Sequence, residues 1–342
     1  MGSTQGVVVY GAYGHTGRFM LSELRDRGYR PIPAGRDEAK LHELAADDPR
    51  LETRPASVDD PDALDRMLKD ADAVINCAGP FAATAAPVLA AALRAGIPYV
   101  DVAAEIEANA DTFAESAEQA REAGVAVVPA MAFYGGLADM LATVAMGDWT
   151  EADEAHVAYG LSSWHPTPGT RGSGVVSRER RGGRRVRFTG GQLAYHDEQP
   201  QVVPWPFPEP LGSSPVTEFT LADAVTIPSH LPIPEVRTYL TAKAAAELAA
   251  PETPAPAPVD DRGRSAQTFL VDVVLRRDGV ERRATAAGQD IYAVSAPLAV
   301  EAVERILTGR TRTTGIASAG AMFDAADFLR ALSPHVEWEL GS

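Results

Sequence analysis

The sequence predicts an α/β fold, with a doubly wound parallel sheet followed by a second α+β domain built on a mixed or antiparallel sheet. Short apolar runs alternate with amphipathic stretches of helical length from residue 6 to about residue 146. This alternation is typical of βαβ units. Beyond about residue 149, proline, glycine and threonine become frequent, and short alternating runs replace the earlier rhythm. We therefore expect a change of domain near that point.

The first half contains six predicted strands, at 7–10, 30–34, 51–55, 73–76, 99–102 and 125–128. Helical patterns lie between them, at 19–27, 62–69, 85–95 and 110–122. Right-handed crossovers between parallel strands place such helices on both faces of one sheet. The expected result is a Rossmann-type doubly wound domain.

The second half contains predicted strands at 156–161, 184–189, 216–220, 268–276 and 282–287. Asp278-Gly279 joins the last two, which is a strong signal for a β-hairpin. A helix is expected at 235–249, before a proline-rich surface connection at 251–259. Two further helices, at 296–307 and 325–332, are expected to return to the first domain. This interpretation divides the chain at 1–148, 149–294 and 295–342.

The composition narrows the classes of partner. The chain has 342 residues, enough to bury two cores, and a formal net charge of −16. That charge opposes binding to nucleic acid, whose phosphates are also negative. No apolar run is long enough to span a membrane, and no leader peptide is recognisable. We expect a cytoplasmic protein that acts on a small molecule, without nucleic-acid or membrane partners.

The cysteine and histidine content argues against metal and disulfide chemistry. Cys77 is the single cysteine, which excludes an internal disulfide and a cysteine-based zinc site. The histidines are scattered without metal-ligand spacing, so no metal site is predicted. A dense basic run at 178–187 is expected to form a solvated hairpin or a patch for an anionic ligand.

The first predicted strand leads into a glycine-rich turn, Gly11-Ala-Tyr-Gly14-His-Thr-Gly17, and then into a helix. This is the G-x-x-G-x-x-G form of the dinucleotide-binding loop. Gly11 permits the tight turn, Gly14 lets the backbone approach a pyrophosphate, and Gly17 lets helix and strand pack closely. The pyrophosphate is expected at the N-terminus of the helix. The candidate contacts of this loop are Gly11, Tyr13, Gly14, His15, Thr16 and Gly17.

The end of the second predicted strand indicates which dinucleotide is bound. NAD-binding domains usually present an acidic residue there to the ribose diol. Here the first polar residue is Arg36, followed by Asp37. A guanidinium at this position can bind a 2′-phosphate through two hydrogen bonds. Asp37 is available to cap the next helix instead, so NADP(H) is the expected cofactor.

Further cofactor contacts are predicted after the third and fourth strands. Ser57 and Asp59 follow the third strand, where the adenine of a dinucleotide usually rests. Small residues follow the fourth strand and allow the ribose and nicotinamide to approach the backbone. An ordinary Gly-Pro turn would explain part of this second segment equally well. The candidates there are Cys77, Ala78, Gly79, Pro80 and Phe81.

Candidate catalytic groups follow the fifth and sixth strands, because ligands of open α/β sheets bind beyond the carboxyl ends of the strands. Asp101 and Glu105 could bind an amine-bearing substrate or transfer a proton to an imine nitrogen; alternatively, Asp101 caps a turn and Glu105 is solvated. Tyr134 could donate a proton to a developing anion, or it could be a wall aromatic. Phe133 precedes it as a candidate substrate contact.

The segment from Trp164 to Ser173 is polar and rich in glycine, without strand or helix periodicity. Loops of this kind often carry function. His165 is a candidate general acid because its pKa lies near neutral pH. Arg171 is a candidate ligand for a carboxylate or carbonyl oxygen, and Trp164 is a candidate substrate contact. An exposed loop without function is the alternative for each of these residues.

These motifs resemble the saccharopine dehydrogenase-like reductases, a group that includes saccharopine reductases, carboxynorspermidine-type enzymes and trans-acting enoyl reductases. The resemblance is carried by the glycine-rich loop with Arg18, Ala-Gly-Arg-Asp at 34–37, Val-Ile-Asn-Cys-Ala-Gly-Pro-Phe at 74–81, and Ala-Gly-Ile-Pro-Tyr-Val-Asp at 95–101 with Glu105. It is weaker at Gly-Gln-Asp-Ile-Tyr, 288–292. The resemblance implies a Rossmann domain, an inserted substrate domain, NAD(P) and often a homodimer. It does not fix the reaction, because members reduce different bonds.

The expected function is an NADPH-dependent reductase that transfers hydride to a C=N, C=C or C=O bond, as in imine or enoyl reduction, with secondary metabolism as a candidate setting. The chain is shorter than the amino-acid-forming members, so saccharopine itself is not the expected substrate. The alternative is a non-catalytic NADP(H)-sensing protein that signals through a partner. Turnover of bound NADPH separates the two.

Overall fold

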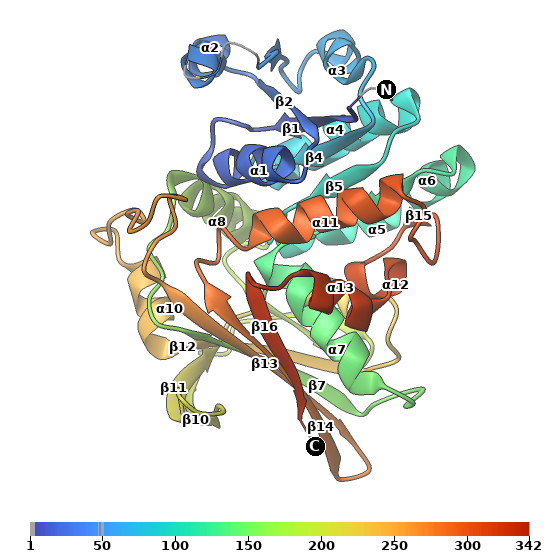
Figure 1. Ribbon diagram of the computed structural model, residues 1–342. Helices are drawn as coiled ribbons and strands as arrows, with labels where there is room; N and C mark the ends of the chain where they lie inside the picture. Colours follow the sequence, from blue (N-terminus) through green and yellow to red (C-terminus); the bar gives the residue numbers. More distant parts are fainter. Residues whose placement is uncertain (1–3, 47, 49–50, 342) are drawn as a thin grey trace.

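The computed structural model describes residues 4–46, 48 and 51–341. It contains two sheets stacked with a layer of helices between them (Figure 1). Sheet A is entirely parallel and has the strand order β15-β6-β5-β4-β1-β2-β3. Its strands are β1 (Gly6–Tyr10), β2 (Arg30–Gly35), β3 (Arg54–Pro55), β4 (Ala73–Asn76), β5 (Tyr99–Asp101), β6 (Ala126–Val128) and β15 (Gly315–Ile316). The prediction of a doubly wound parallel sheet is confirmed.

Apolar side chains point to both faces of sheet A along its central strand β1, and helices cover both faces. Val7 and Val9 of β1 pack into the larger core between the two sheets, whereas Val8 and Tyr10 pack into a core on the opposite face. The helices that follow the first strands are α1 (His15–Asp26), α2 (Glu38–Ala46), α3 (Pro61–Leu68), α4 (Phe81–Ala95), α5 (Ile106–Glu115) and α6 (Ala117–Ala123). The helix expected at 110–122 is thus two helices, α5 and α6, which meet at Ser116.

Sheet B is mixed, with the order β10-β11-β12-β7-β13-β14-β16; β8 pairs with β12 and β9. Its pairs are antiparallel apart from β12 with β7. Asp278 and Gly279 both have positive φ, 51° and 77°, as a tight hairpin requires. The strands are β7 (Glu154–Leu161), β8 (Arg185–Thr189), β9 (Gln192–His196), β10 (Val202–Pro206), β11 (Ser213–Glu218), β12 (Glu235–Thr241), β13 (Thr268–Arg277), β14 (Val280–Gln289) and β16 (Val336–Gly341). The prediction of a second, mixed sheet is confirmed.

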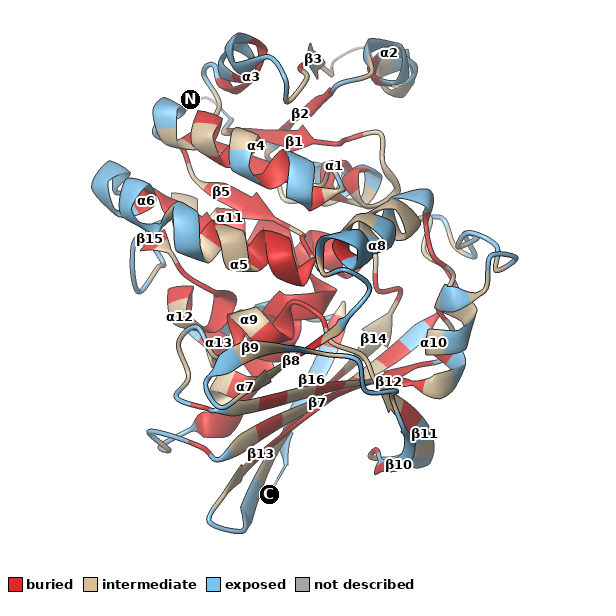
Figure 2. Ribbon diagram, turned by 180° about the vertical axis from the view of Figure 1, so that it is seen from behind, coloured by how far each residue is buried: buried red, intermediate tan, exposed pale blue. Residues whose placement is uncertain are grey.

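The layer between the sheets is built from η1 (Phe133–Leu137), α7 (Ala138–Met146), α9 (Asp223–Thr226), α11 (Ser295–Leu307), α12 (Ala319–Met322) and α13 (Ala325–Ala331). Helix α7 packs on sheet B, and α11 packs on α1 of the first domain. Figure 2 shows buried residues along α7 and along the strands that it covers. The two remaining helices, α8 (Pro168–Arg180) and α10 (Ala242–Ala249), lie on the same side of the molecule in both views (Figures 1 and 2).

Two local predictions in the second half were wrong. The helix expected at 235–249 is strand β12 followed by α10. Val236, Thr238 and Leu240 are buried and the residues between them are less buried, which is the two-residue period of a strand. The loop expected at 164–173 contains the start of α8. Its glycines lower helix propensity, but Thr167 caps the helix by accepting a hydrogen bond from the Thr170 amide.

The last fifty residues of the chain form strands as well as the expected helices. Helix α11 and strand β15 do return to the first domain, where β15 pairs with β6. Strand β16, which was not expected, pairs with β14 at the edge of sheet B. The basic run at 178–187 is the end of α8 and the start of β8 rather than a hairpin of its own. The domain boundaries drawn from the sequence stay a prediction.

Within the described residues, no helix combines the length and the apolar character needed to cross a membrane. The same residues contain no group of histidine, cysteine, aspartate and glutamate side chains suited to hold a metal ion.

Candidate cofactor and substrate site

The three loop glycines differ in the space around them. Gly11 has a φ of +87°, and a Cβ there would lie 2.8 Å from the Ala78 nitrogen. A Cβ on Gly17 would lie 2.4 Å from the Gly11 carbonyl oxygen. At Gly14, by contrast, a Cβ would meet only the Gly11 carbonyl oxygen, at 3.1 Å. Gly11 and Gly17 thus allow close packing, whereas Gly14 leaves open a cradle above the N-terminus of α1.

The start of α1 fits an anionic group. Gly14 occupies the N-cap position, where it offers no side-chain acceptor to the first amides, and the first turn contains no acidic residue. These amides therefore point toward the cradle with no protein acceptor at the cap. The Nε2 atom of His15 is buried and has no hydrogen-bond partner, and burial lowers the pKa of this side chain. The residues present fit the pyrophosphate of a dinucleotide.

The end of β2 provides a free cation beside this cradle. Arg36 is exposed, and in the described part of the chain its guanidinium has no partner. Asp37 instead caps α2, because its Oδ1 atom accepts a hydrogen bond from the Lys40 amide at 3.1 Å, and this bond lowers the pKa of Asp37. The ring of Tyr13 covers Gly35, where a Cβ would lie 2.7 Å from it. Arg36 is thus available to a 2′-phosphate, and Asp37 faces its own helix.

The segments after β3 and β4 border the same edge of the sheet. Asp59 donates its amide to the Ser57 hydroxyl at 3.3 Å, which forms a local turn. Cys77 is half-buried, and its amide donates to the Tyr10 carbonyl at 2.8 Å. Gly79 is exposed but lies against α8, since a Cβ there would be 2.6 Å from the Ser173 hydroxyl. Helix α8 therefore abuts the segment where the nicotinamide half of a dinucleotide is expected; Ala78 and Pro80 are half-buried there, and Phe81 is buried.

Asp101 and Glu105 are buried, and their carboxylates accept hydrogen bonds from the backbone. Asp101 accepts from the amides of Ala103 and Ala130, at 3.0 and 2.8 Å, and from the Tyr99 hydroxyl. Burial raises its pKa to about 6. Glu105 accepts from the amides of Phe81 and Ala82, at 2.8 and 3.0 Å, and so caps α4; it is not solvated. Both residues hold the carboxyl edge of sheet A together, and a part in proton transfer stays a prediction.

Tyr292, which ends the 288–292 motif but was not among the candidate site residues, connects the two domains. Asp290 fixes its position by accepting the Tyr292 amide at 2.9 Å. The Tyr292 hydroxyl accepts from the Trp164 indole N–H at 3.0 Å and lies 2.9 Å from the Thr170 hydroxyl. The Tyr292 ring meets the His15 ring edge-on, with centroids 5.3 Å apart. The Gly-Gln-Asp-Ile-Tyr motif therefore joins Trp164 to the dinucleotide-binding loop.

Arg171 and His165, the other two candidates in the 164–173 segment, lie outside the aromatic cluster contacts made by Trp164. The guanidinium of Arg171 donates to the carbonyls of Ala250 and Thr253, at 3.0 and 2.9 Å, so in this structure it serves the C-terminus of α10. His165 is half-buried, and its carbonyl accepts from the Tyr292 hydroxyl at 3.4 Å. Their parts in substrate binding and proton transfer stay predictions.

An aromatic cluster surrounds Tyr134 just after β6. The Tyr134 ring lies 4.8 Å from Phe133, 4.8 Å from Tyr159 and 5.2 Å from Trp164, measured between centroids. Its hydroxyl is buried and has no hydrogen-bond partner, and burial raises the pKa of this phenol well above 10. An unpaired buried hydroxyl is costly. Trp164 continues the cluster toward Phe219.

Asp223 completes this cluster and was missed in the sequence. Its Oδ1 atom accepts from the Gly135 amide at 3.0 Å and from the Tyr159 hydroxyl at 2.8 Å, whereas its Oδ2 atom is buried without a partner. The residue is fully buried. The sequence did contain a signal for Asp223, which lies in the apolar segment Leu-Ala-Asp-Ala-Val, 221–225. An aspartate in such a segment is rarely buried without a hydrogen-bond or ionic partner, and it therefore indicates a structural or functional role.

The Asp223 carboxyl makes the stability of the protein depend on pH. Burial raises its pKa from 3.8 to about 6. The folded protein holds the proton more tightly than the unfolded chain, so the stabilising effect is complete below about pH 4 and is lost as the pH rises through about 6. We expect the unfolding free energy of the wild type, relative to Asp223→Asn, to fall by roughly 3 kcal/mol over this interval. Urea titrations across the interval measure it; a difference that does not change with pH would contradict the assignment.

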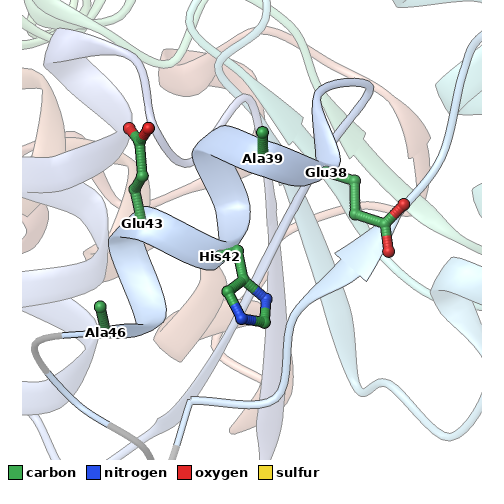
Figure 3. A pocket seen from close by; sticks show the side chains of 5 residues that line it. All are labelled: Glu38, Ala39, His42, Glu43 and Ala46. Atoms are coloured by element: carbon green, nitrogen blue, oxygen red, sulfur yellow. The ribbon is translucent and has the colours of Figure 1, made fainter.

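A shallow hollow on α2 has no part in this arrangement. It is lined by Glu38, Ala39, His42, Glu43 and Ala46 (Figure 3). The side chains of His42 and Glu43 point to opposite sides of the helix, so the hollow offers no convergent set of polar groups.

The glycine cradle, the free Arg36 and the parallel sheet define a dinucleotide-binding α/β protein with a second domain at the carboxyl edge of its sheet. Residues 7–128 match the family model described as the saccharopine dehydrogenase NADP binding domain. This match confirms, for residues 7–128, the resemblance seen in the sequence, and it supports NADP(H) as the cofactor.

Two curated relatives and one solved structure show how far the likeness extends. A probable mitochondrial saccharopine dehydrogenase-like oxidoreductase of Arabidopsis thaliana is 30% identical over 142 residues, 37% of this chain and 31% of that protein. A saccharopine dehydrogenase-like oxidoreductase of Mus musculus is 28% identical over 152 residues, 39% and 35% of the two chains. This chain matches only about a third of the length of these relatives. Saccharopine dehydrogenase (L-Glu forming) of Saccharomyces cerevisiae shares the fold over 99% of this chain and all of that chain, with a TM-score of 0.67 and 13% identity.

Proposed function

We propose that this protein is an NADPH-dependent reductase that transfers hydride to a C=N, C=C or C=O bond of a small molecule. The observation that carries the proposal is the contact between His15 and Tyr292. Through Tyr292 and Trp164, this contact joins the dinucleotide-binding loop to the aromatic cluster around Tyr134. A cofactor cradle and a buried, unpaired proton-bearing group thus share the carboxyl edge of sheet A, where ligands of such sheets bind.

The residues divide the work of the reaction between binding and chemistry. The N-terminal amides of α1 bind the pyrophosphate, and Arg36 binds the 2′-phosphate. When bound, the nicotinamide supplies the hydride. The aromatic side chains of Phe133, Tyr134 and Trp164 exclude water and orient the substrate. Where hydride addition leaves an anion, as at a C=O, a C=C or an unprotonated C=N bond, the Tyr134 hydroxyl donates the proton; an iminium needs none, and there the hydroxyl serves as a hydrogen-bond acceptor.

The proposal is tested by NADPH consumption in the presence of representative imines, enones and ketones. We expect one class to give saturable NADPH oxidation matched mole for mole by reduced product. Tyr134→Phe is expected to lower kcat by roughly 100-fold while the NADPH dissociation constant stays the same, because the phenol takes part in chemistry and not in cofactor binding. Tight NADPH binding without consumption in any class would favour an NADP(H) sensor instead.

We also propose that the protein is a homodimer. In the described part of the chain, β10 and β16 are the edge strands of sheet B, and each pairs on one side only. Edge strands are commonly covered by association or protected by proline and charge. Light scattering after size exclusion is expected to give twice the 36.2 kDa mass of one chain; a mass of one chain would refute this part of the proposal.

A further inference from the structure

Two buried polar atoms beside the aromatic cluster have no partner within the described protein: the Tyr134 hydroxyl and Asp223 Oδ2. Tyr134 is 7% exposed and Asp223 is fully buried. Buried polar groups in folded proteins are nearly always satisfied, so each exception calls for an explanation. Both atoms belong to one neighbourhood, because the Asp223 carboxylate receives the amide of Gly135, the residue that follows Tyr134.

The local backbone is built to keep these two groups together. Gly135 has a φ of +94°, and a Cβ there would lie 2.7 Å from the Ala130 Cβ and 2.9 Å from the Ala130 carbonyl oxygen. The Thr226 hydroxyl of α9 donates to the Gly135 carbonyl at 3.4 Å. Helix α9 is therefore attached to the η1 segment through both the amide and the carbonyl of a residue that has to be glycine.

Aromatic rings rather than cations surround the pair. Tyr159 contacts both groups, with its ring 4.8 Å from Tyr134 and its hydroxyl 2.8 Å from Asp223 Oδ1. The Trp164 ring packs against Tyr134, with centroids 5.2 Å apart. Arg171, the cation expected to bind a substrate carboxylate, donates instead to two carbonyls near α10. A carboxylate placed here would meet a second carboxylate and no described guanidinium.

We propose that Tyr134 and Asp223 select a substrate that carries a cationic nitrogen on an apolar body and no carboxylate next to that nitrogen. The free Asp223 oxygen accepts the N–H of a protonated amine or iminium. The faces of Tyr134, Tyr159 and Trp164 stabilise the same charge through cation–π contacts, which favour aromatic enclosures for cationic ligands. The hydroxyl of Tyr134 supplies the second hydrogen bond. This inference rests on the proposed reductase function and specifies its substrate class.

The test compares two probes that differ by one carboxylate: tetrahydroisoquinoline and tetrahydroisoquinoline carboxylic acid. Their binding to the NADP⁺-loaded protein is measured by calorimetry at neutral pH. We expect the amine to bind at least about tenfold more tightly than the amino acid. Asp223→Asn is expected to weaken amine binding about tenfold, and Tyr134→Phe about threefold, with NADP⁺ affinity unchanged.

Asp65→Asn serves as the matched control. Asp65 is an exposed aspartate of α3 paired with Arg94, and its replacement is expected to leave the affinity for the amine unchanged. Equal or tighter binding of the amino acid, or no binding of either probe, would overturn the inference, and this comparison needs only the wild type. Amine binding without turnover of any imine, enone or ketone would refute the reductase function and retain the role of Tyr134 and Asp223 in amine binding. Turnover of carboxylated substrates without amine binding would refute that role and retain the reductase function.

Discussion

Replacing Glu301 with alanine is expected to lower the unfolding free energy by about 3–5 kcal/mol. Glu301 is 3% exposed, and its two carboxylate oxygens accept hydrogen bonds from Arg27 of α1 and Arg305 of α11. Arg305 is 2% exposed and also pairs with Asp327 of α13. Removal of the shared carboxylate would leave the buried Arg305 with Asp327 alone and the partly buried Arg27 with Glu23 and Glu304, and the interface between α1 and α11 would weaken.

Glu304 provides a control on the same helix. It pairs with Arg27 at 3.2 Å and with Arg310 at 3.1 Å, but about a third of its side chain is exposed. Glu304→Ala is therefore expected to cost less than about 1 kcal/mol. Urea unfolding of both variants measures the difference. Similar losses for the two variants would show that the buried network is not a principal link between the domains.

Gly14→Asp is expected to abolish NADPH binding, with a loss of affinity of at least about 100-fold, while the fold is retained or slightly stabilised. Gly14 has the extended N-cap conformation, with φ −68° and ψ 165°, which suits an aspartate, although its Cβ would lie 3.1 Å from the Gly11 carbonyl oxygen and requires a small local shift. Its carboxylate would cap the first amides of α1, which stabilises a helix by a few tenths of a kcal/mol relative to glycine. The same carboxylate would occupy the cradle and repel a pyrophosphate.

Gly28→Asp is the matched control at the other end of α1. A Cβ on Gly28 meets no other atom within 4 Å, and its positive φ of 79° is a conformation that aspartate tolerates better than most residues. It adds the same charge about one helix length away, and NADPH affinity is expected to stay within about twofold. Thermal unfolding together with NADPH titration separates the effects. Retained NADPH binding by Gly14→Asp would place the pyrophosphate elsewhere.

The cofactor half of the site could be predicted from the sequence because its requirements are local. Gly11, Gly14 and Gly17 lie within seven residues. The role of each glycine depends on the backbone of this one short loop, so their spacing along the chain is enough to reveal it. Arg36 is equally local, because the end of one strand determines its position. The free guanidinium and the capping role of Asp37 follow from the order of these two residues along the chain.

The substrate half could not be predicted in the same way, because its contacts join distant segments. Asp223 binds the amide of Gly135 and the hydroxyl of Tyr159, residues 88 and 64 positions away. Tyr292 reaches Trp164 across 128 positions. No local motif marks such partners, since the topology of sheet B brings them together.

The errors in secondary structure have a similar origin. The alanine-rich end of 235–249 favours a helix, and the first seven residues also carry the alternation of a strand; pairing of β12 with β7 and β11 decided in favour of the strand. In α8, three glycines concealed a helix whose start is determined by Thr167 and Pro168. Tertiary contacts outweighed local propensity in the first case, and capping outweighed it in the second.

Equilibrium binding of NADPH and NADH to the wild type and to Arg36→Ala tests whether this chain holds NADP(H) in a cradle completed by Arg36. We predict that NADPH binds the wild type more tightly than NADH by roughly 10–100-fold, and that Arg36→Ala removes this preference by weakening NADPH alone. Equal affinities in the wild type, or a preference that survives in the variant, would contradict the role of Arg36. Failure of either nucleotide to bind would contradict the account as a whole.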